Sequence, residues 1–291
     1  METTELIKKV RKIEIKSKGL SQNIFAGEYH SAFKGRGMMF SEVREYQYGD
    51  DIRDIDWNVT ARHNKPYVKV FEEERELTVM LLVDMSNSRT FGAVGVEKRE
   101  LIAEIVATLA FSAIQNNDKI GVIFFTDKIE KVIYPQKGKK HILFIIRELL
   151  SFEPENKRTD ISVALKFHTD ALKKRCTTFL ISDFIDEHDY SKALCVASNK
   201  HDLIALQVYD KREAQLPDVG LMKVTDLESN QQQWIDTSSK KTRQAYDKWW
   251  YQRQQKMCEM FLKAKVDFTS IATDEDFVKS LMTLFKQREV K

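Results

Sequence analysis

The apolar run from Leu77 to Val83 constrains the fold of this chain more than any other stretch. Its seven residues, LTVMLLV, are too few to span a membrane, so they predict a strand that is buried on both faces of a parallel sheet. The run ends at Asp84, and Ser86 and Ser88 follow at alternating positions. Because open α/β folds bind ligands at the carboxyl edge of the sheet, these three oxygen-bearing side chains form a candidate site for a hard cation such as Mg2+. The alternative is a capping aspartate followed by two turn serines.

The composition excludes several classes of protein. With 291 residues, 42% of them hydrophobic, the chain can bury a full core. Its 47 basic and 44 acidic residues are mixed along the chain, so neither nucleic acid nor an anionic membrane is expected as a partner. The three cysteines, Cys176, Cys195 and Cys258, have the spacing of neither a disulfide framework nor a zinc motif, and a cytoplasmic location is expected. No membrane span and no signal peptide are expected, because no apolar run reaches about 18 residues.

Strand and helix patterns alternate from Leu77 to Tyr209, which predicts an α/β fold with a doubly wound, mostly parallel sheet. An alternating piece at 129–134 is expected to pair with the strand before it at a sheet edge, and 219–236 to form a two-stranded excursion. Strands are expected at 77–83, 119–126, 176–182, 201–209 and 266–271, and helices at 97–115, 139–150, 160–175, 190–199, 239–265 and 274–288.

The first 76 residues differ in character from the rest. An amphipathic helix is expected at 5–16, and after it glycines interrupt short aromatic and β-branched pieces, of which 67–71 alternates like a strand. Such a segment cannot easily bury a core of its own. We therefore expect two parts: an N-terminal helix and β/loop wrap at 1–76, and an α/β domain at 77–291.

A dense cluster of charged residues lies inside the expected wrap. Acting as general acids or metal ligands is one possible role for the aspartates, but aspartate and arginine alternating beside a tryptophan are typical of a partly buried ion-pair network that fixes a loop. We therefore expect Arg53→Ala or Trp57→Ala to destabilise the fold. The cluster comprises Asp50, Asp51, Arg53, Asp54, Asp56, Trp57 and Arg62.

Oxygen-bearing side chains occur at three separate strand-to-helix junctions. Asp84, Ser86 and Ser88 follow the first strand, Thr159 precedes a helix, and Asp183 ends the strand at 176–182. In a parallel sheet all carboxyl ends lie on one edge, so these groups can converge there. The sequence therefore predicts a Mg2+ or Mn2+ site made by these five residues.

The residues of this candidate site resemble a known metal site. D-M-S-N-S at 84–88, a threonine that opens a helix with Ala164 and Leu165 downstream, and L-I-S-D at 180–183 are similar to the metal-ion-dependent adhesion site of von Willebrand factor type A domains. The resemblance implies a von Willebrand factor A-like domain. It also implies that Ser86, Ser88 and Thr159 ligate the metal directly or nearly so, while Asp84 and Asp183 accept hydrogen bonds from bound waters. Two departures are that Lys157 and Arg158 stand where adhesion-type domains usually carry glycines, and that the loop after Ser88 is longer.

A second resemblance covers about residues 33–210. The segment GRGMMFSEVREYQYGDDIRDIDWNVTAR, followed by VKVFEEERE and the D-x-S-x-S strand, resembles the bacterial domain-of-unknown-function family fifty-eight. Members of that family are commonly associated with MoxR-type AAA+ ATPases and are thought to act as binding or chaperone-like partners. The resemblance implies the same role here.

The sequence favours binding over catalysis. His63, His168 and Cys176 have no base or orienting acid at the spacing that nucleophilic chemistry requires, so no enzyme activity is expected. The expected function is a metal-dependent module that captures a carboxylate of a protein partner, a MoxR-type AAA+ ATPase or its client. Two alternatives stay open: a metal-dependent phosphohydrolase with Asp84 as nucleophile, although position 86 is serine instead of an acid, and a metal-free scaffold.

Overall fold

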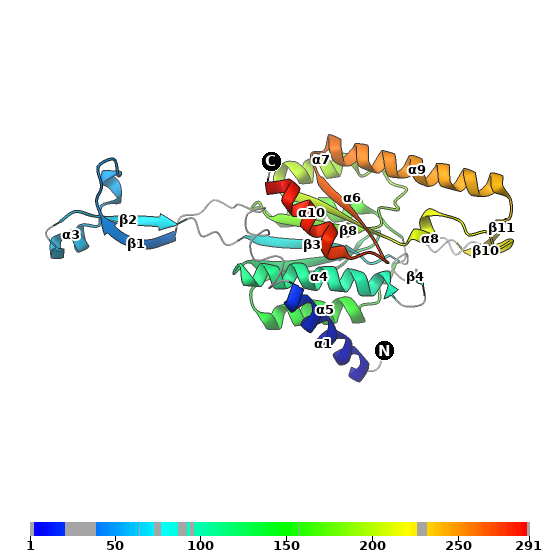
Figure 1. Cartoon of the computed structure of the whole chain (residues 1–291), viewed down its shortest axis with the longest axis horizontal. Coiled ribbons are helices and arrows are strands. Elements are labelled where there is room, and N and C mark those ends of the chain that lie inside the picture. The colour runs from blue at the N-terminus through cyan, green and yellow to red at the C-terminus, as the bar shows by residue number, and fades with distance from the viewer. Residues whose placement is uncertain are drawn as a thin grey trace. The chain divides into compact units, whose positions relative to one another are not determined.

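A six-stranded sheet forms the centre of the larger part of the chain (Figure 1). The computed structural model describes residues 3–20, 39–63, 65–72, 77–86, 92–93, 96–156, 158–225 and 232–289. The strands of the sheet are β3 (Thr78–Asp84), β6 (Lys119–Phe125), β7 (Ile129–Gln136), β8 (Thr177–Ser182), β9 (Asp202–Tyr209) and β12 (Asp267–Ala272). They lie in the order β12, β9, β8, β3, β6, β7. All neighbours are parallel except β6 and β7, so the predicted doubly wound, mostly parallel α/β fold is confirmed.

β3 lies in the middle of the sheet because its side chains are apolar on both faces. Its residues 79–83 are at most 1% exposed. Burying each side chain of this kind contributes about 1.5–3 kcal/mol. β3 pairs in parallel with β6 on one side and β8 on the other, so the residues that follow these three strands share one edge of the sheet.

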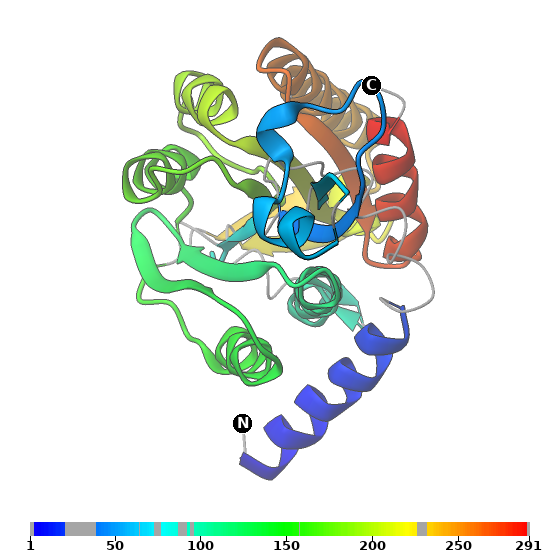
Figure 2. The ribbon, with the colours of Figure 1, turned by 90° about the vertical axis from the view of Figure 1, so that its left-hand side faces the viewer.

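Helices cover both faces of the sheet (Figure 2). On one face, α6, α7 and α9 pack against Met80 and Leu82 of β3. On the other, α4 packs on α5, and α10 places the ring of Phe285 6.5 Å from that of Phe179. Two helical layers around one sheet are the architecture that the alternating pattern predicted. The helices are α4 (Lys98–Gln115), α5 (Lys139–Ser151), α6 (Ile161–Ala171), α7 (Ser191–Lys200), α8 (Lys211–Ala214), α9 (Lys240–Lys263) and α10 (Phe277–Glu289).

β7 closes one edge of the sheet as the antiparallel partner of β6, in the place that its alternating pattern indicated. Gly121 of β6 permits the close approach of the two strands. A Cβ atom at this position would lie 2.8 Å from the carbonyl oxygen of Ile133 and 2.9 Å from the nitrogen of Pro135. No side chain fits there without moving backbone.

The N-terminal helix α1 (Thr3–Leu20) is longer than the helix expected at 5–16. It packs on α4 and α5, with Lys16 Nζ 2.6 Å from Glu104 Oε2 and Lys139 Nζ 2.6 Å from Glu14 Oε1. The contacts of the chain group residues 1–32 with 78–291 in one unit and residues 33–77 in a second. α1 therefore belongs with the α/β unit, whereas the expected division had placed it with the wrap. That residues 1–76 cover the α/β domain as a wrap stays a prediction.

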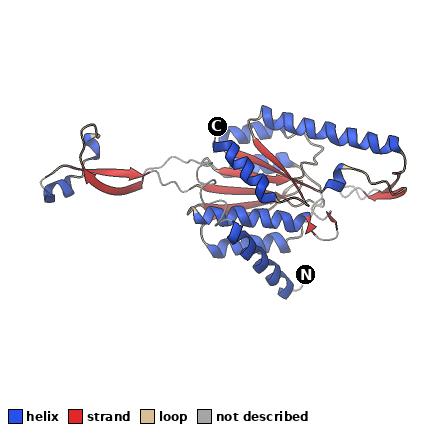
Figure 3. Ribbon diagram, in the orientation of Figure 1, coloured by secondary structure: helices blue, strands red, loops and turns tan. Residues whose placement is uncertain are grey.

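The smaller unit is built on an antiparallel pair of strands, β1 (Met39–Glu45) and β2 (Tyr67–Glu72) (Figure 3). Between them lie the short helices η2 (Ile52–Asp54) and α3 (Trp57–His63). Asp51 and Asp56 accept hydrogen bonds from the first backbone amides of η2 and α3, as capping residues do.

The predicted ion-pair network of this unit exists, but with other partners. Arg44 donates two hydrogen bonds to Asp50, at 2.7 and 2.8 Å, and Lys69 lies 3.7 Å from Asp56. Arg53 and Trp57, the expected members of the network, are both exposed, Trp57 by 67%. The expected place of Arg53 and Trp57 in a buried network was therefore wrong, because the cations come from the two strands and not from the helical segment between the aspartates. That Arg53→Ala or Trp57→Ala destabilises the fold loses this basis and stays untested.

The remaining elements lie where the sequence placed them, with shifted ends. The excursion at 219–236 is the antiparallel pair β10 (Leu221–Thr225) and β11 (Gln232–Asp236), and Ser239 caps α9. α6 ends at Ala171 instead of 175, because Leu172 is extended. A third small pair is β4 (Gly92–Ala93) and β5 (Val96–Glu97). Among the described residues no helix has both the length and the apolar character needed to cross a bilayer.

Candidate metal site at the carboxyl edge of the sheet

Asp84 is the last residue of β3, and its carboxylate is almost fully buried. One oxygen accepts a hydrogen bond from the backbone amide of Ser86 at 2.9 Å, and the other accepts one from the hydroxyl of Ser182 at 2.7 Å. Ser182 ends β8, the strand beside β3, so its position follows from the parallel register. The carboxylate is thus held in place by groups of two neighbouring strands.

Asp183 follows β8 directly and is also buried. Its Oδ1 accepts a hydrogen bond from the amide of Ile185 at 2.9 Å, and its backbone carbonyl accepts one from the side chain of Gln207 at 3.4 Å. Burial, and next to it the negative charge of Asp183, raise the pKa of Asp84 to about 7. Asp183 therefore lies near enough to Asp84 to disfavour the charged form of Asp84.

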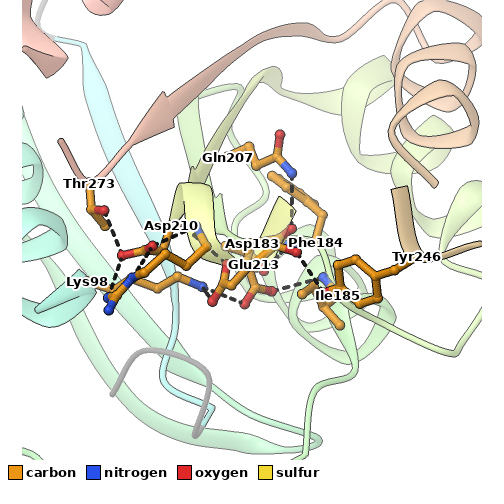
Figure 4. Close-up of polar contacts among 11 residues, drawn as sticks. Lys98, Asp183, Phe184, Ile185, Gln207, Asp210, Glu213, Tyr246 and Thr273 are labelled. Carbon is orange, nitrogen blue, oxygen red and sulfur yellow. Dashed lines mark hydrogen bonds and ion pairs between the residues drawn. The ribbon is translucent and has the colours of Figure 1, made fainter. Parts of the chain in front are cut away.

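Lys98 brings a cation to the same edge (Figure 4). It is the first residue of α4 and is 1% exposed. Its Nζ lies 3.3 Å from Asp183 Oδ2 and 2.5 Å from Glu213 Oε1. Burial alone would lower the pKa of Lys98, but the charges of Asp183 and Glu213 outweigh burial and raise that pKa. Burial raises the pKa of Glu213, and Lys98 opposes that shift.

Glu213 is positioned by the short helix α8. Asp210 caps this helix, and the Glu213 side chain accepts a hydrogen bond from the backbone amide of Asp210, which completes a capping box. Asp210 also accepts hydrogen bonds from Arg212 and from the hydroxyl of Thr273, at 3.0 Å each (Figure 4). Tyr246 of α9 donates to the backbone carbonyl of Glu213 at 2.7 Å.

Thr159 reaches the same edge from the other side of β3. The side chain is 3% exposed and belongs to the loop that leads into α6. The next residue, Asp160, donates its backbone amide to the carbonyl of Thr126, which follows β6, and its carboxylate caps α6. The loop is held from β8 as well, because Asp186 accepts a hydrogen bond from the amide of Ile161 at 2.8 Å.

The structure thus places four of the five predicted ligands at the carboxyl edge. Asp84, Ser86 and Asp183 lie together, and Thr159 lies at the end of the neighbouring strand β6. Ser88 lies outside the described residues. So does Lys157, one of the two residues that stand where adhesion-type domains usually carry glycines. Ligation of a metal by these side chains stays a prediction.

The sequence analysis missed Lys98, Glu213 and Ser182. A weak signal existed for Lys98, because a lysine in the first turn of a helix is unfavourable for the helix dipole and needs a local reason. The reason is the buried carboxylate of Asp183 together with the largely buried one of Glu213. Glu213 gave no such signal, because it lies 115 positions further along the chain and comes into place only through α8.

The chemistry of these side chains suits a hard divalent cation. All candidate ligands are carboxylate or hydroxyl oxygens, which Mg2+ and Mn2+ prefer. Three carboxylates and one ammonium carry a net charge of −2 when all four are ionised. Burial, and after it the charge of Asp183, raise the pKa of Asp84. A divalent cation would supply the missing compensation, so the residues present fit the metal that the resemblance implies.

Comparisons with known proteins point to one family. The family model described as protein of unknown function DUF58 matches residues 42–256. The uncharacterized protein Rv1480 of Mycobacterium tuberculosis is 30% identical over 222 residues, which are 76% of this chain and 70% of that protein.

Similar solved structures include proteins with low sequence identity. An aerotolerance-related membrane protein of Bacteroides fragilis is 17% identical, with a TM-score of 0.49, over 74% of this chain and 98% of that one. The VWA domain of SpRpn10 is 10% identical, with a TM-score of 0.39, over 73% of this chain and 95% of that one.

Proposed function

The chain belongs to the DUF58 family, and we propose that it is a metal-dependent protein-binding module whose carboxyl edge takes a carboxylate of a partner protein. The observation that carries the proposal is the pair Asp84 and Asp183, two buried carboxylates that adjacent strands hold at the edge where open sheets bind ligands. Mg2+ is the proposed ion, because the donors are all hard oxygens.

Each residue has a distinct part in this proposal. Asp84 and Asp183 provide negatively charged oxygens, and Ser86 and Thr159 provide uncharged hydroxyl oxygens. Mg2+ bound there would keep a coordination position for an acidic side chain of the partner. Lys98 holds Asp183 from the side of α4 and keeps one of its oxygens engaged. Because serine and threonine hydroxyls are neutral, they do not cancel the positive charge of the ion, and the ion therefore favours an anionic partner.

The proposed partner is a MoxR-type AAA+ ATPase or a client of that ATPase, as the resemblance to the family implies. The family likeness supports this choice, and the carboxylate preference of the site is compatible with it. We place the complex in the bacterial cytoplasm, where the unpaired Cys176, Cys195 and Cys258 would stay reduced. In this proposal the chain binds without turnover.

A pull-down from native lysate tests the proposal. The intact chain is used as bait with Mg2+ and with EDTA, beside Asp84→Ala and the control Glu187→Ala. Glu187 is an exposed carboxylate of the loop after β8, so its removal changes the surface charge there without touching the buried pair. We expect a partner that is retained with Mg2+ by the parent and by Glu187→Ala, and lost with EDTA and with Asp84→Ala. The same partners in all four samples would reject metal-dependent capture.

The position of Lys98 favours a second candidate function, that of a metal-dependent phosphohydrolase. A phosphohydrolase needs a cation near the transferred phosphoryl group, and Lys98 lies at the edge that holds Asp84. Against this function, Lys98 is buried and already paired with two carboxylates. Hydrolysis of para-nitrophenyl phosphate by the parent, lost in Asp84→Ala and kept in Glu187→Ala, would decide for the hydrolase.

A further inference from the structure

Two histidines and a cysteine meet at the opposite end of β8. Cys176 directly precedes this strand, His168 lies in α6, and His201 follows α7. Asp183 lies at the other end of the strand, and six residues of β-strand span about 20 Å. The cluster is therefore separate from the carboxylates at the carboxyl edge.

The three side chains present their donor atoms to one another. Cys176 Sγ lies 3.2 Å from His201 Nδ1 and 3.8 Å from His168 Nε2, and the two imidazole rings are 4.3 Å apart. Zinc bonds of about 2.3 Å to sulfur and 2.0–2.1 Å to nitrogen put the two ligand atoms about 3.5 Å apart in a tetrahedral site. The observed separations lie on either side of that value. Thr178 Oγ1 lies 2.8 Å from His168 Nε2 and 3.5 Å from the sulfur, where a fourth donor would be.

The hydrogen bonds of this cluster do not satisfy all of its buried polar atoms. His168, Cys176 and His201 are at most 5% exposed. His168 Nδ1 and His201 Nε2 are buried and have no hydrogen-bond partner among the described residues. The atoms that face one another are the Cys176 sulfur, His168 Nε2 and His201 Nδ1, which are the donor atoms that a cation between them would use. The two nitrogens without a partner lie on the far side of each ring, so each ring is free to bind a metal through its other nitrogen.

The donor types of the cluster suit a metal. Two imidazole nitrogens and one sulfur lie within 4.8 Å of one another, and all three residues are buried. The thiol must lose its proton to the solvent when the ion binds.

We infer that His168, Cys176 and His201 form a second metal site, specific for a thiophilic transition ion such as Zn2+ and structural in role. Sulfur and imidazole donors select Zn2+ over Mg2+, so the two sites of the chain would not compete for the same ion. The site joins α6, the start of β8 and the junction of α7 with β9. The spacing of these ligands matches no zinc motif, since the first two lie 8 positions apart and the last two 25, and the site could therefore not be predicted from the sequence.

Metal analysis of the chain purified from zinc-supplemented culture tests the inference. The parent is compared with Cys176→Ser, with the exposed-thiol control Cys195→Ser, and with Asp84→Ala, which removes the carboxyl-edge site. We expect about one Zn2+ per chain in the parent and in both Cys195→Ser and Asp84→Ala, and about tenfold less in Cys176→Ser. Absence of zinc from the parent, or equal content in Cys176→Ser, would overturn the inference.

A spectroscopic measurement covers the case in which Cys176→Ser does not fold. Co2+ is added to the parent and to Cys195→Ser after removal of zinc. We expect the near-ultraviolet absorption of a thiolate–cobalt bond in both proteins, because Cys176 is retained in both. A cobalt complex without that absorption would show that the sulfur is not a ligand, and would overturn the inference without any variant of the site.

Discussion

The ammonium group of Lys98 lies 3.3 Å from a carboxylate oxygen of Asp183, and both side chains are almost fully buried. Lys98 and Asp183 come from the start of a helix and the end of a strand that are 85 positions apart. Asp84, on the adjacent strand, is held by a hydroxyl and an amide. The edge therefore contains an internal cation that compensates Asp183 and Glu213, while the hydrogen bonds that hold Asp84 come from uncharged groups.

Lys98→Met should destabilise the fold strongly. Methionine keeps most of the volume but removes the charge, so Asp183 and Glu213 stay buried without their cation. Breaking a buried ion pair in this way costs about 3 to 5 kcal/mol. Urea denaturation in EDTA should show that loss. The matched control is Lys16→Met, which removes the half-exposed partner of Glu104 and should change the free energy of unfolding by no more than about 1 kcal/mol.

Mg2+ should stabilise Lys98→Met more than it stabilises the parent, because the ion replaces a charge that the variant lacks. Equal unfolding free energies for Lys98→Met and Lys16→Met would show that the ion pairs of Lys98 with Asp183 and Glu213 do not stabilise the fold. An equal gain in stability from Mg2+ in Lys98→Met and in the parent would show that Lys98 does not influence metal binding.

Asp210→Asn should change how stability depends on acid pH. Hydrogen bonds from Arg212, opposed by burial and assisted by Thr273, lower the pKa of Asp210 to about 2 from its ordinary value of 3.8. A group whose pKa is lower in the folded state stabilises the fold above its unfolded pKa, and this contribution is lost as the pH falls from about 4 through about 2. The expected contribution is about 1 to 2 kcal/mol.

Denaturation of the parent and of Asp210→Asn at pH 6 and at pH 2.5 measures this effect. The parent should lose more stability than the variant between the two values, because asparagine does not titrate. The same loss in both proteins would mean that Asp210 has its ordinary pKa in the folded chain.

Gly121→Ala should disturb the edge of the sheet. The added methyl group would meet the carbonyl oxygen of Ile133 and the nitrogen of Pro135 at less than 3 Å, and both are backbone atoms of β7 that cannot rotate away. Overpacking of this kind costs about 1 to 3 kcal/mol. Thermal denaturation should show a lower midpoint for the variant. An unchanged midpoint would mean that β7 shifts freely, contrary to its register with β6.

Much of the fold could be predicted because its elements are locally encoded. The central strand is a continuous apolar run, the edge strand alternates, and Ser239 stands where a capping residue is needed. Asp84 and Asp183 could be placed at one edge because all parallel strands end there. That inference requires only that the strands run parallel. It does not require knowledge of the distances between them.

Contacts between distant segments could not be predicted. Lys98 and Glu213 meet through the packing of α4 beside α8, which no pattern along the chain reveals. The sequence pattern grouped Asp50 with Arg53 and Arg62, whereas the arginine that pairs with Asp50 is Arg44 of β1. The contact of His168 with His201 could not be predicted for the same reason, since the sheet and its helices bring them together.

Calorimetric titration of Mg2+ into the intact chain is the most direct test of the metal site at the carboxyl edge. The parent, Asp84→Ala and the control Glu187→Ala are titrated under the same conditions after dialysis against EDTA and metal-free buffer. The expected result is saturable binding by the parent and by Glu187→Ala, and affinity at least about tenfold weaker in Asp84→Ala, because one of the two buried carboxylates is gone. Equal heats for the parent and Asp84→Ala, or no binding by the parent, would contradict a metal site formed by Asp84 and Asp183.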